Sequence, residues 1–159
     1  MYIGFGFDIH GFSSDRPLVL GGIEIPGEPG LKGHSDADCL LHALADALLG
    51  AAGLGDIGEH FPDTDPEYKG ANSSELLKHC VFLLAEKGLV PVNADITVIT
   101  EIPKLTPHKQ KIRKRVADLL DLDTERINIK ATTMEGFGPI GNRQALACQA
   151  AVLCTAGRG

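Results

Sequence analysis

Two pairs of acidic and histidine side chains near the start of the chain have a spacing that suits metal binding. Asp8 and His10 stand two residues apart in a segment whose loose alternation predicts a strand, so both side chains project from one face. Asp38 and His42 stand four residues apart in a predicted helix, on one face a turn apart, and Asp46 continues the same stripe. Asp8, His10 and His42 together offer two nitrogens and one oxygen, which is the donor set of a catalytic zinc site with one open position.

Each pair alone also fits a structural role. A strand pair of this kind is commonly a surface pair or a hydrogen bond, and a helix with one polar face needs no ligand. A magnesium site would prefer more oxygen ligands, and a closed structural zinc site would prefer a fourth protein ligand. His34 lies at the junction of a loop with the helix, so we expect it to contact substrate.

A second chemical cluster stands where a predicted strand runs into a glycine-containing turn. Thr132 and Thr133 carry hydroxyls which, with the amides of the turn, can hold phosphate oxygens, and Glu135 can hold a hard cation. Gly53–Gly58 is glycine-rich, but it follows a helix instead of opening one, so it does not fit a dinucleotide fingerprint. Asp56 within it could still hydrogen-bond a ribose.

Composition and charge limit the partners. A chain of 159 residues predicts a single domain, here residues 1–159. The net charge of −6 and the aromatic content of 5% argue against nucleic acid, but they allow a phosphorylated small molecule if metal ions or backbone dipoles supply positive potential. No apolar run approaches the ~20 residues of a membrane span. We therefore expect neither a nucleic-acid partner nor a membrane partner.

The cysteines and the N-terminal residues indicate in which cellular compartment the protein is expected. Cys39, Cys80, Cys148 and Cys154 show no CxxC spacing, and the first residues have neither the basic nor the apolar region of a signal peptide. We expect a cytoplasmic protein with reduced, mostly buried thiols. A plastid form with its transit peptide removed is the alternative.

The elements that must position these residues follow from periodicity. The pattern predicts helices over 36–52, 73–88 and 107–120, the last with Thr106 as its N-cap, and a long loop over 53–70. It predicts strands over 2–10, 18–25, 92–100, 126–133 and 145–153, the second interrupted by a tight turn at Gly21 and Gly22. This order predicts an α+β sandwich, a mixed sheet with helices packed on one face. The opposite face is also apolar, so we expect it to be buried in an oligomer.

Four segments together resemble a known family. GFDIHGF, GHSDADCLLHALADALLGAAGLGDIGEHFPDTD, PKLTPH and IKATTMEGFG are similar to segments of the 2-C-methyl-D-erythritol 2,4-cyclodiphosphate synthases, and the resemblance runs from Ile3 to about Leu153. It implies an α/β sandwich that forms a homotrimer with active sites at the subunit interfaces. It also implies an enzyme of the non-mevalonate isoprenoid pathway, a lyase that cyclises 4-diphosphocytidyl-2-C-methyl-D-erythritol 2-phosphate and releases CMP.

The same resemblance implies site residues at the matching positions. Asp8, His10 and His42 fall on the ligands of one zinc ion per subunit, and Glu135 falls on the ligand of a Mg2+ or Mn2+ ion between the substrate phosphates. His34 and Thr133 fall on catalytic positions that stabilise the transition state. The implied substrate contacts are Asp8, His10, His34, Ser35, Asp56, Ile57, Gly58, Phe61, Pro62, Asp63, Thr64, Asp65, Thr100, Glu101, Ile102, Pro103, Lys104, Leu105, Thr106, Thr132, Thr133, Met134 and Glu135. Of these, 56–58 match ribose contacts, 61–65 a loop over the methylerythritol, 100–106 the cytosine pocket, and 132–133 diphosphate contacts.

The resemblance weakens at Pro139–Ala145. Asn142 and Gln144 replace an arginine and a glutamate near the trimer axis of the usual members, where a central cavity accepts an isoprenoid diphosphate. Binding of such a ligand is therefore left open, since Arg143 could substitute. Two other functions also stay open from the residues alone. A metal-dependent phosphohydrolase would use water as nucleophile, and a non-catalytic nucleotide-binding trimer would bind without turnover.

Overall fold

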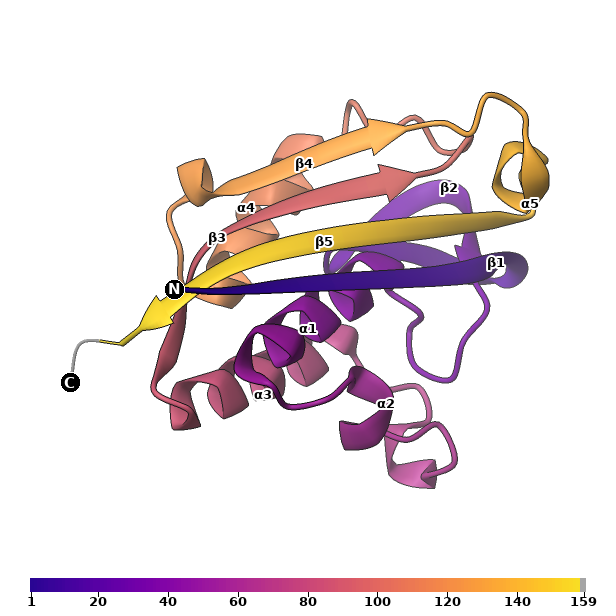
Figure 1. The fold of residues 1–159 in the computed structure, drawn as a ribbon. Helices are drawn as coiled ribbons and strands as arrows, with labels where there is room; N and C mark the ends of the chain where they lie inside the picture. The colour runs from indigo at the N-terminus through magenta and orange to yellow at the C-terminus, as the bar shows by residue number, and fades with distance from the viewer. Residues whose placement is uncertain (158–159) are drawn as a thin grey trace.

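The computed structural model describes residues 1–157, which form a five-stranded sheet with helices on one face (Figure 1). The strand order is β2-β1-β5-β3-β4, in which β3 and β4 are parallel and every other neighbouring pair is antiparallel. The strands are β1 (Tyr2–Leu20), β2 (Ile23–Leu31), β3 (Leu89–Ile99), β4 (Ile127–Thr132) and β5 (Ala145–Ala156). The predicted mixed sheet is confirmed.

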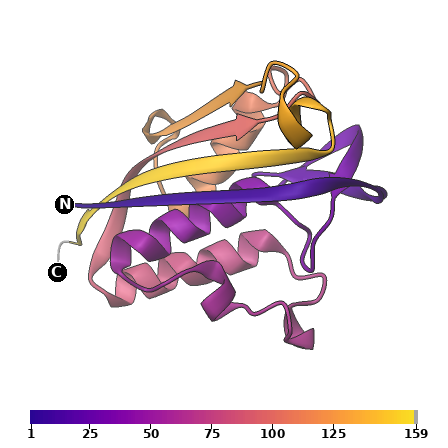
Figure 2. The same cartoon turned by 45° about the vertical axis from the view of Figure 1, so that its right-hand side comes forward.

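Three long helices cover one face of this sheet. α1 (Cys39–Ala52) packs against β1 and β5, α3 (Ser73–Glu86) packs against α1, and α4 (Lys109–Leu120) packs against β4. Figure 2 shows α1 and α3 below β1 and β5, and α4 behind β3 and β4. The short elements are α2 (Ile57–His60), η1 (Pro66–Tyr68), η2 (Thr124–Arg126) and α5 (Gly138–Gly141). The α+β class with helices on one face is confirmed, and no helix of residues 1–157 is long and apolar enough to cross a membrane.

The first strand is longer than the sequence pattern predicts. β1 continues past His10 to Leu20, and the chain then turns at Gly21 and Gly22, both with positive φ, into β2. The predicted strand over 18–25 is therefore the end of one hairpin arm and the start of the next. The segment predicted as a loop over 53–70 contains α2 and η1.

Two helices begin later than predicted, α1 at Cys39 instead of residue 36 and α4 at Lys109 instead of residue 107. α1 begins at Cys39 because Asp38 is its N-cap, with a side chain that accepts a hydrogen bond from the amide of Leu41. The helix predicted from residue 107 begins at Lys109. A turn precedes it, in which the amides of His108 and Lys109 donate to the carbonyl of Leu105.

Two glycines let α1 lie directly on β1. A Cβ atom added to Gly4 would lie 1.7 Å from the carbonyl oxygen of Ala47, and one added to Gly6 would lie 1.9 Å from that of Ala43. The two elements therefore meet through main-chain atoms along this glycine seam. The seam brings the polar residues at the end of β1 beside those of α1.

The uncovered face of the sheet is apolar along β1. Alternation places Ile3, Phe5, Phe7 and Ile9 there, with 77%, 64%, 47% and 47% of their surfaces exposed. Contiguous exposed apolar surface of this kind usually marks an interaction site. The apolar outer face that the sequence predicts is present.

The core contains aliphatic side chains and the four cysteines. Leucine, isoleucine, valine and alanine make up most of the buried residues, and all four cysteines are buried with free thiols, as predicted. Burial raises the pKa of the Cys80 thiol to about 12, so this side chain stays protonated and unreactive near neutral pH.

Candidate metal centre and substrate cavity

Three predicted ligands meet where β1 passes α1. Oδ2 of Asp8 lies 2.8 Å from Nε2 of His10 and 3.1 Å from Nδ1 of His42, and the two nitrogens are 3.3 Å apart. Two ligands at about 2.0–2.1 Å from a tetrahedral zinc ion lie about 3.3 Å apart, so these atoms suit a single ion. This is the one group of its kind found among residues 1–157.

Each histidine has its other ring nitrogen engaged. Nδ1 of His10 lies 2.6 Å from the carbonyl oxygen of Lys32, which can only accept, so Nδ1 carries the hydrogen and Nε2 offers a lone pair. Nε2 of His42 lies 2.9 Å from Oγ of Ser73 and 3.2 Å from Oγ of Ser35. The two rings thus offer different nitrogens, Nε2 of His10 and Nδ1 of His42, to the same point.

The carboxylate of this centre is held in its charged form. Burial would raise the pKa of Asp8, but hydrogen bonds and charge from His10 and His42 hold it below the usual range. Burial would lower the pKa of His10, yet the hydrogen bond and charge of Asp8 raise it. At neutral pH the oxygen of Asp8 is therefore ionised, as a metal ligand must be.

A cavity of about 540 Å³ opens beside the two histidines, a volume that suits a small molecule. Eight predicted substrate contacts outside the metal centre line it: His34, Ser35, Ile57, Gly58, Phe61, Pro62, Asp63 and Thr64. Gly33, Tyr68 and Leu76 also line it and were not predicted. Asp56 and Asp65 do not, since their side chains cap α2 and η1.

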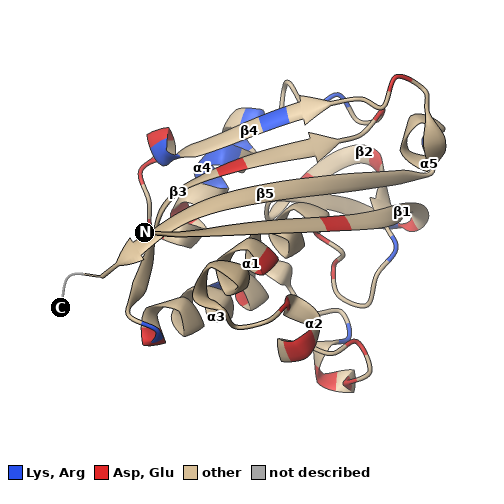
Figure 3. Cartoon of the chain, in the orientation of Figure 1, with Lys and Arg blue, Asp and Glu red and all other residues tan. Residues whose placement is uncertain are grey.

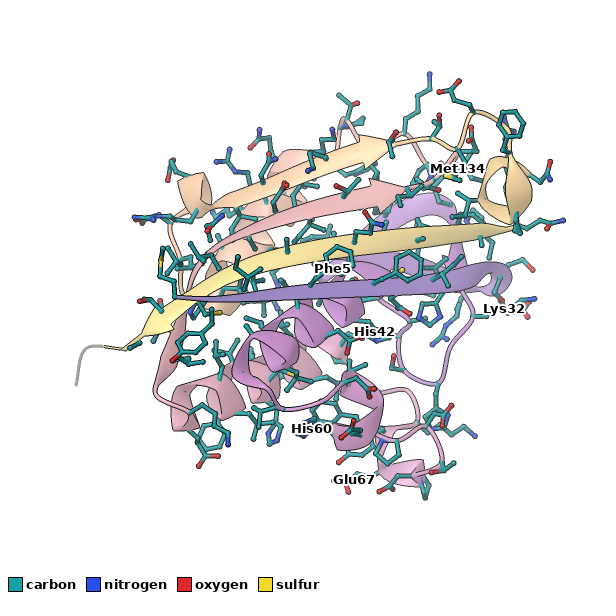
Figure 4. All side chains as sticks on the ribbon, viewed as in Figure 1. Phe5, Lys32, His42, His60, Glu67 and Met134 are labelled. Carbon is teal, nitrogen blue, oxygen red and sulfur yellow. The ribbon has the colours of Figure 1, made fainter. Side chains whose placement is uncertain are left out.

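The remaining predicted residues form a second group at the ends of β3 and β4. The amide of Thr100 donates to the carbonyl of Thr132, and the amide of Met134 donates to Oε1 of Glu101, both at 2.9 Å. The hydroxyl of Thr133 donates to Oε1 of Glu135, also at 2.9 Å. No residue of 100–106 or 132–135 lines the cavity. Figure 4 labels Met134 near α5 and His42 on the helical side of β1, so one chain keeps the two groups apart.

The two aspartates that share the helical stripe of His42 do not join the metal centre. Asp38 is buried and accepts hydrogen bonds from the amides of Gly21 and Gly22 at 2.9 and 2.6 Å. Oδ1 of Asp46 accepts a hydrogen bond from the amide of Ile57 at 2.7 Å, and this bond connects α1 to α2. Burial raises the pKa of Asp46, and the amide of Ile57 opposes that effect.

We expect Asp46→Ala to raise the KM for substrate and to leave metal content unchanged. Without the carboxylate, α2 loses the acceptor that holds Ile57 and Gly58 at the cavity. A hydrogen bond to a charged group contributes about 1.5–3 kcal/mol, so KM should rise roughly tenfold to a hundredfold. Steady-state kinetics with zinc analysis measures both effects. Asp46→Asn is the control, because it keeps an oxygen acceptor, and an unchanged KM in the alanine variant would contradict the assignment.

Three residues of this region were not predicted from the sequence to belong to the site. Arg16 donates to the carbonyl oxygens of Gly33 and Ser35 at 2.9 and 2.5 Å, and so braces the loop that carries His34. Ser73 contacts His42 through its hydroxyl, and Asp36 accepts a hydrogen bond from that hydroxyl. All three act across turns and loops, where residue spacing does not indicate contact.

Comparisons with known proteins agree with this arrangement. The YgbB family model matches residues 1–155. A Symbiobacterium thermophilum protein named 2-C-methyl-D-erythritol 2,4-cyclodiphosphate synthase is 56% identical over 153 residues, which are 96% of this chain and 98% of that protein. A solved synthase of the same name, in a bound form with CDP, aligns with a TM-score of 0.89 and 38% identity over 96% of this chain and 99% of that one. The CDP complex of IspF from Plasmodium falciparum aligns with a TM-score of 0.86 and 34% identity over 99% of this chain and 97% of that one.

Proposed function

The chain belongs to the YgbB family, and we propose that Asp8, His10 and His42 hold the zinc ion of its active site. The enzyme is a 2,4-cyclodiphosphate synthase of isoprenoid precursor biosynthesis, which cyclises 4-diphosphocytidyl-2-C-methyl-D-erythritol 2-phosphate and releases CMP. The observation that carries the metal assignment is the set of three ligand atoms within 4.8 Å of one another beside a cavity.

To catalyse this reaction, the protein must bring two anionic groups together, the 2-phosphate and the diphosphate. The 2-phosphate attacks the β-phosphorus of the CDP group, and the bond from that phosphorus to the CMP oxygen breaks. The attacking phosphate has its second pKa at ~6, so it is already ionised and needs no strong general base. Figure 3 shows Lys and Arg on α4 and β4 and acidic residues around α2. Among residues 1–157, no lysine or arginine lines the cavity, so its wall supplies little positive charge. Divalent ions, when bound, would supply it at the phosphate oxygens.

Several side chains of the cavity would position the substrate. Ser35 Oγ accepts the amide of Ala37 at 3.1 Å, and its own hydrogen is free to bind a substrate oxygen if His42 keeps a hydrogen on Nε2. His34 lines the cavity beside it, and we assign both residues to the methylerythritol phosphate end, with His34 also stabilising the transition state. Positioning and charge stabilisation then account for most of the rate.

We assign the second group to the cytidine diphosphate part of the substrate. The turn 100–106 would bind cytosine, and Thr132, Thr133 and the amides of the turn would bind the diphosphate. Glu135 would hold the second divalent ion, Mg2+ or Mn2+, and Thr133 would stabilise the transition state. The CDP complexes among the solved relatives support a nucleotide at this family's site.

We propose that a complete active site forms between subunits of a homotrimer. Two observations support it: the two groups of predicted site residues are separate on one chain, and the outer face of β1 exposes Ile3, Phe5, Phe7 and Ile9. Residues 1–159 would act as a single catalytic domain of each subunit. We further propose a cytoplasmic location, without a nucleic-acid or membrane partner.

Phosphorus-31 NMR tests the proposed function directly. The zinc-loaded protein with magnesium and substrate should yield CMP and cyclic diphosphate in equal amounts. A linear product that contains solvent oxygen would identify a phosphohydrolase instead. Absence of turnover in a folded, metal-replete trimer would identify a nucleotide-binding protein.

A further inference from the structure

A line of hydrogen bonds runs from the metal centre to the start of α3. Nε2 of His42 lies 2.9 Å from Oγ of Ser73, and that hydroxyl donates in turn to Oδ1 of Asp36. The backbone amide of Ser73 donates to Oδ2 of the same carboxylate at 3.0 Å. Ser73 has only 1% of its surface exposed, so water does not compete for these contacts.

The direction of each hydrogen bond follows from what each group can donate. The carboxylate of Asp36 can only accept, so the single hydrogen of the Ser73 hydroxyl is committed to it. Oγ of Ser73 must then accept from Nε2 of His42, which therefore carries the hydrogen of a neutral imidazole. Nδ1 of His42 is left with its lone pair facing Asp8 and His10.

We propose that Ser73 and Asp36 are positioning residues that hold His42 in the tautomer and orientation needed to bind the metal through Nδ1. The inference rests on the proposed function, in which His42 is a metal ligand. Partners of this outer kind orient a ligand and raise its basicity, and their loss typically weakens metal binding by roughly 10–100-fold.

The capping of α3 does not account for the Ser73 hydroxyl. The N-cap of this helix is Asn72, whose side chain accepts the amide of Ser74 at 2.8 Å. Asp36 has a further local bond, since its Oδ1 also accepts the amide of Asp38 at 3.2 Å. Substitution of Ser73 is therefore the cleaner test, because it removes the bond to His42 and leaves both local turns in place.

The test measures metal affinity, together with activity, in the full-length protein. We expect Ser73→Ala to bind zinc roughly 10–100-fold more weakly in competition with a chelator, and to alter the visible spectrum of the cobalt-substituted protein. Ser73→Thr keeps a hydroxyl and should restore most of the affinity. Ser74→Ala is the matched control, since Ser74 is the adjacent buried serine and its hydroxyl has no hydrogen bond to His42 or Asp36.

The outcomes separate this inference from the function on which it rests. If the wild type binds zinc, His42→Ala does not, and Ser73→Ala matches the wild type in affinity and spectrum, the positioning role is overturned and the metal centre stands. If the wild type binds no zinc, the metal centre itself is wrong. Should Ser73→Ala fail to fold, Asp36→Asn decides in its place, because a neutral amide is the weaker acceptor and should lower zinc affinity severalfold; unchanged affinity there would overturn the proposal.

Discussion

Replacing His42 with alanine is expected to abolish zinc binding and cyclisation while leaving the fold intact. The variant keeps one nitrogen and one oxygen of the centre, too few for a three-ligand catalytic site. The loss should exceed the roughly 10–100-fold effect typical of an outer partner. The fold should survive because α1 is held by its buried leucines and by the glycine seam, whereas His42 lines the cavity.

Zinc content, phosphorus-31 NMR and thermal unfolding followed by circular dichroism measure the three parts of this prediction. His79→Ala is a suitable control, since His79 is an exposed histidine of α3 outside the metal centre and its loss should leave zinc content unchanged. Unfolding of the His42 variant would show that the centre stabilises the fold and is not a catalytic site. Full zinc content in that variant would remove His42 from the ligand set.

Replacing Phe5 with aspartate is expected to yield folded single chains without synthase activity. The side chain has 64% of its surface exposed on the outer face of β1, so a carboxylate there is solvated in a separate chain. In a trimer the same carboxylate would be buried in an apolar interface, at a cost of several kcal/mol, and association should weaken more than roughly a hundredfold. Activity should fall with it, because each proposed site needs residues of two subunits.

Sedimentation velocity with parallel activity assays checks this second prediction. The wild type should sediment at three times the 16.9 kDa of one chain, and the variant at the mass of one chain. Phe82→Asp is the matched control, since Phe82 is 56% exposed on α3 and its change should leave assembly intact. An active Phe5 variant of single-chain mass would show that one subunit contains a complete site.

Local periodicity predicted most of the sheet and helices, and it was wrong where contacts decided the boundary. The alternation along β1 correctly predicted that Asp8 and His10 share one face, and the structure places them on the face opposite the exposed Phe5. The same strand continues to Leu20 through a polar stretch without alternation, because pairing with β2 extends it. α4 begins at Lys109, later than predicted, because a turn precedes it in which the amides of His108 and Lys109 donate to the carbonyl of Leu105.

The three residues of the metal centre could be predicted from the sequence, but the hydrogen bonds that Ser73 makes to His42 and Asp36 could not. Asp8 and His10 share a strand face and His42 shares a helix face, so residue types and two short periods suggested all three. The bond from Ser73 to His42 spans 31 positions and that from Ser73 to Asp36 spans 37. No short-range pattern links positions so far apart, and serine and aspartate at a helix start suggest capping first.

The glycine seam between β1 and α1 has a consequence for how this enzyme can change over evolutionary time. Gly4 and Gly6 meet the carbonyl oxygens of Ala47 and Ala43, so main-chain atoms common to every sequence set the distance between the β1 and α1 residues of the candidate metal centre. A side chain added at either glycine would therefore separate α1 from β1 and pull these residues apart. A protein engineer who exchanges Asp8, His10 or His42 to favour another metal should therefore keep both glycines.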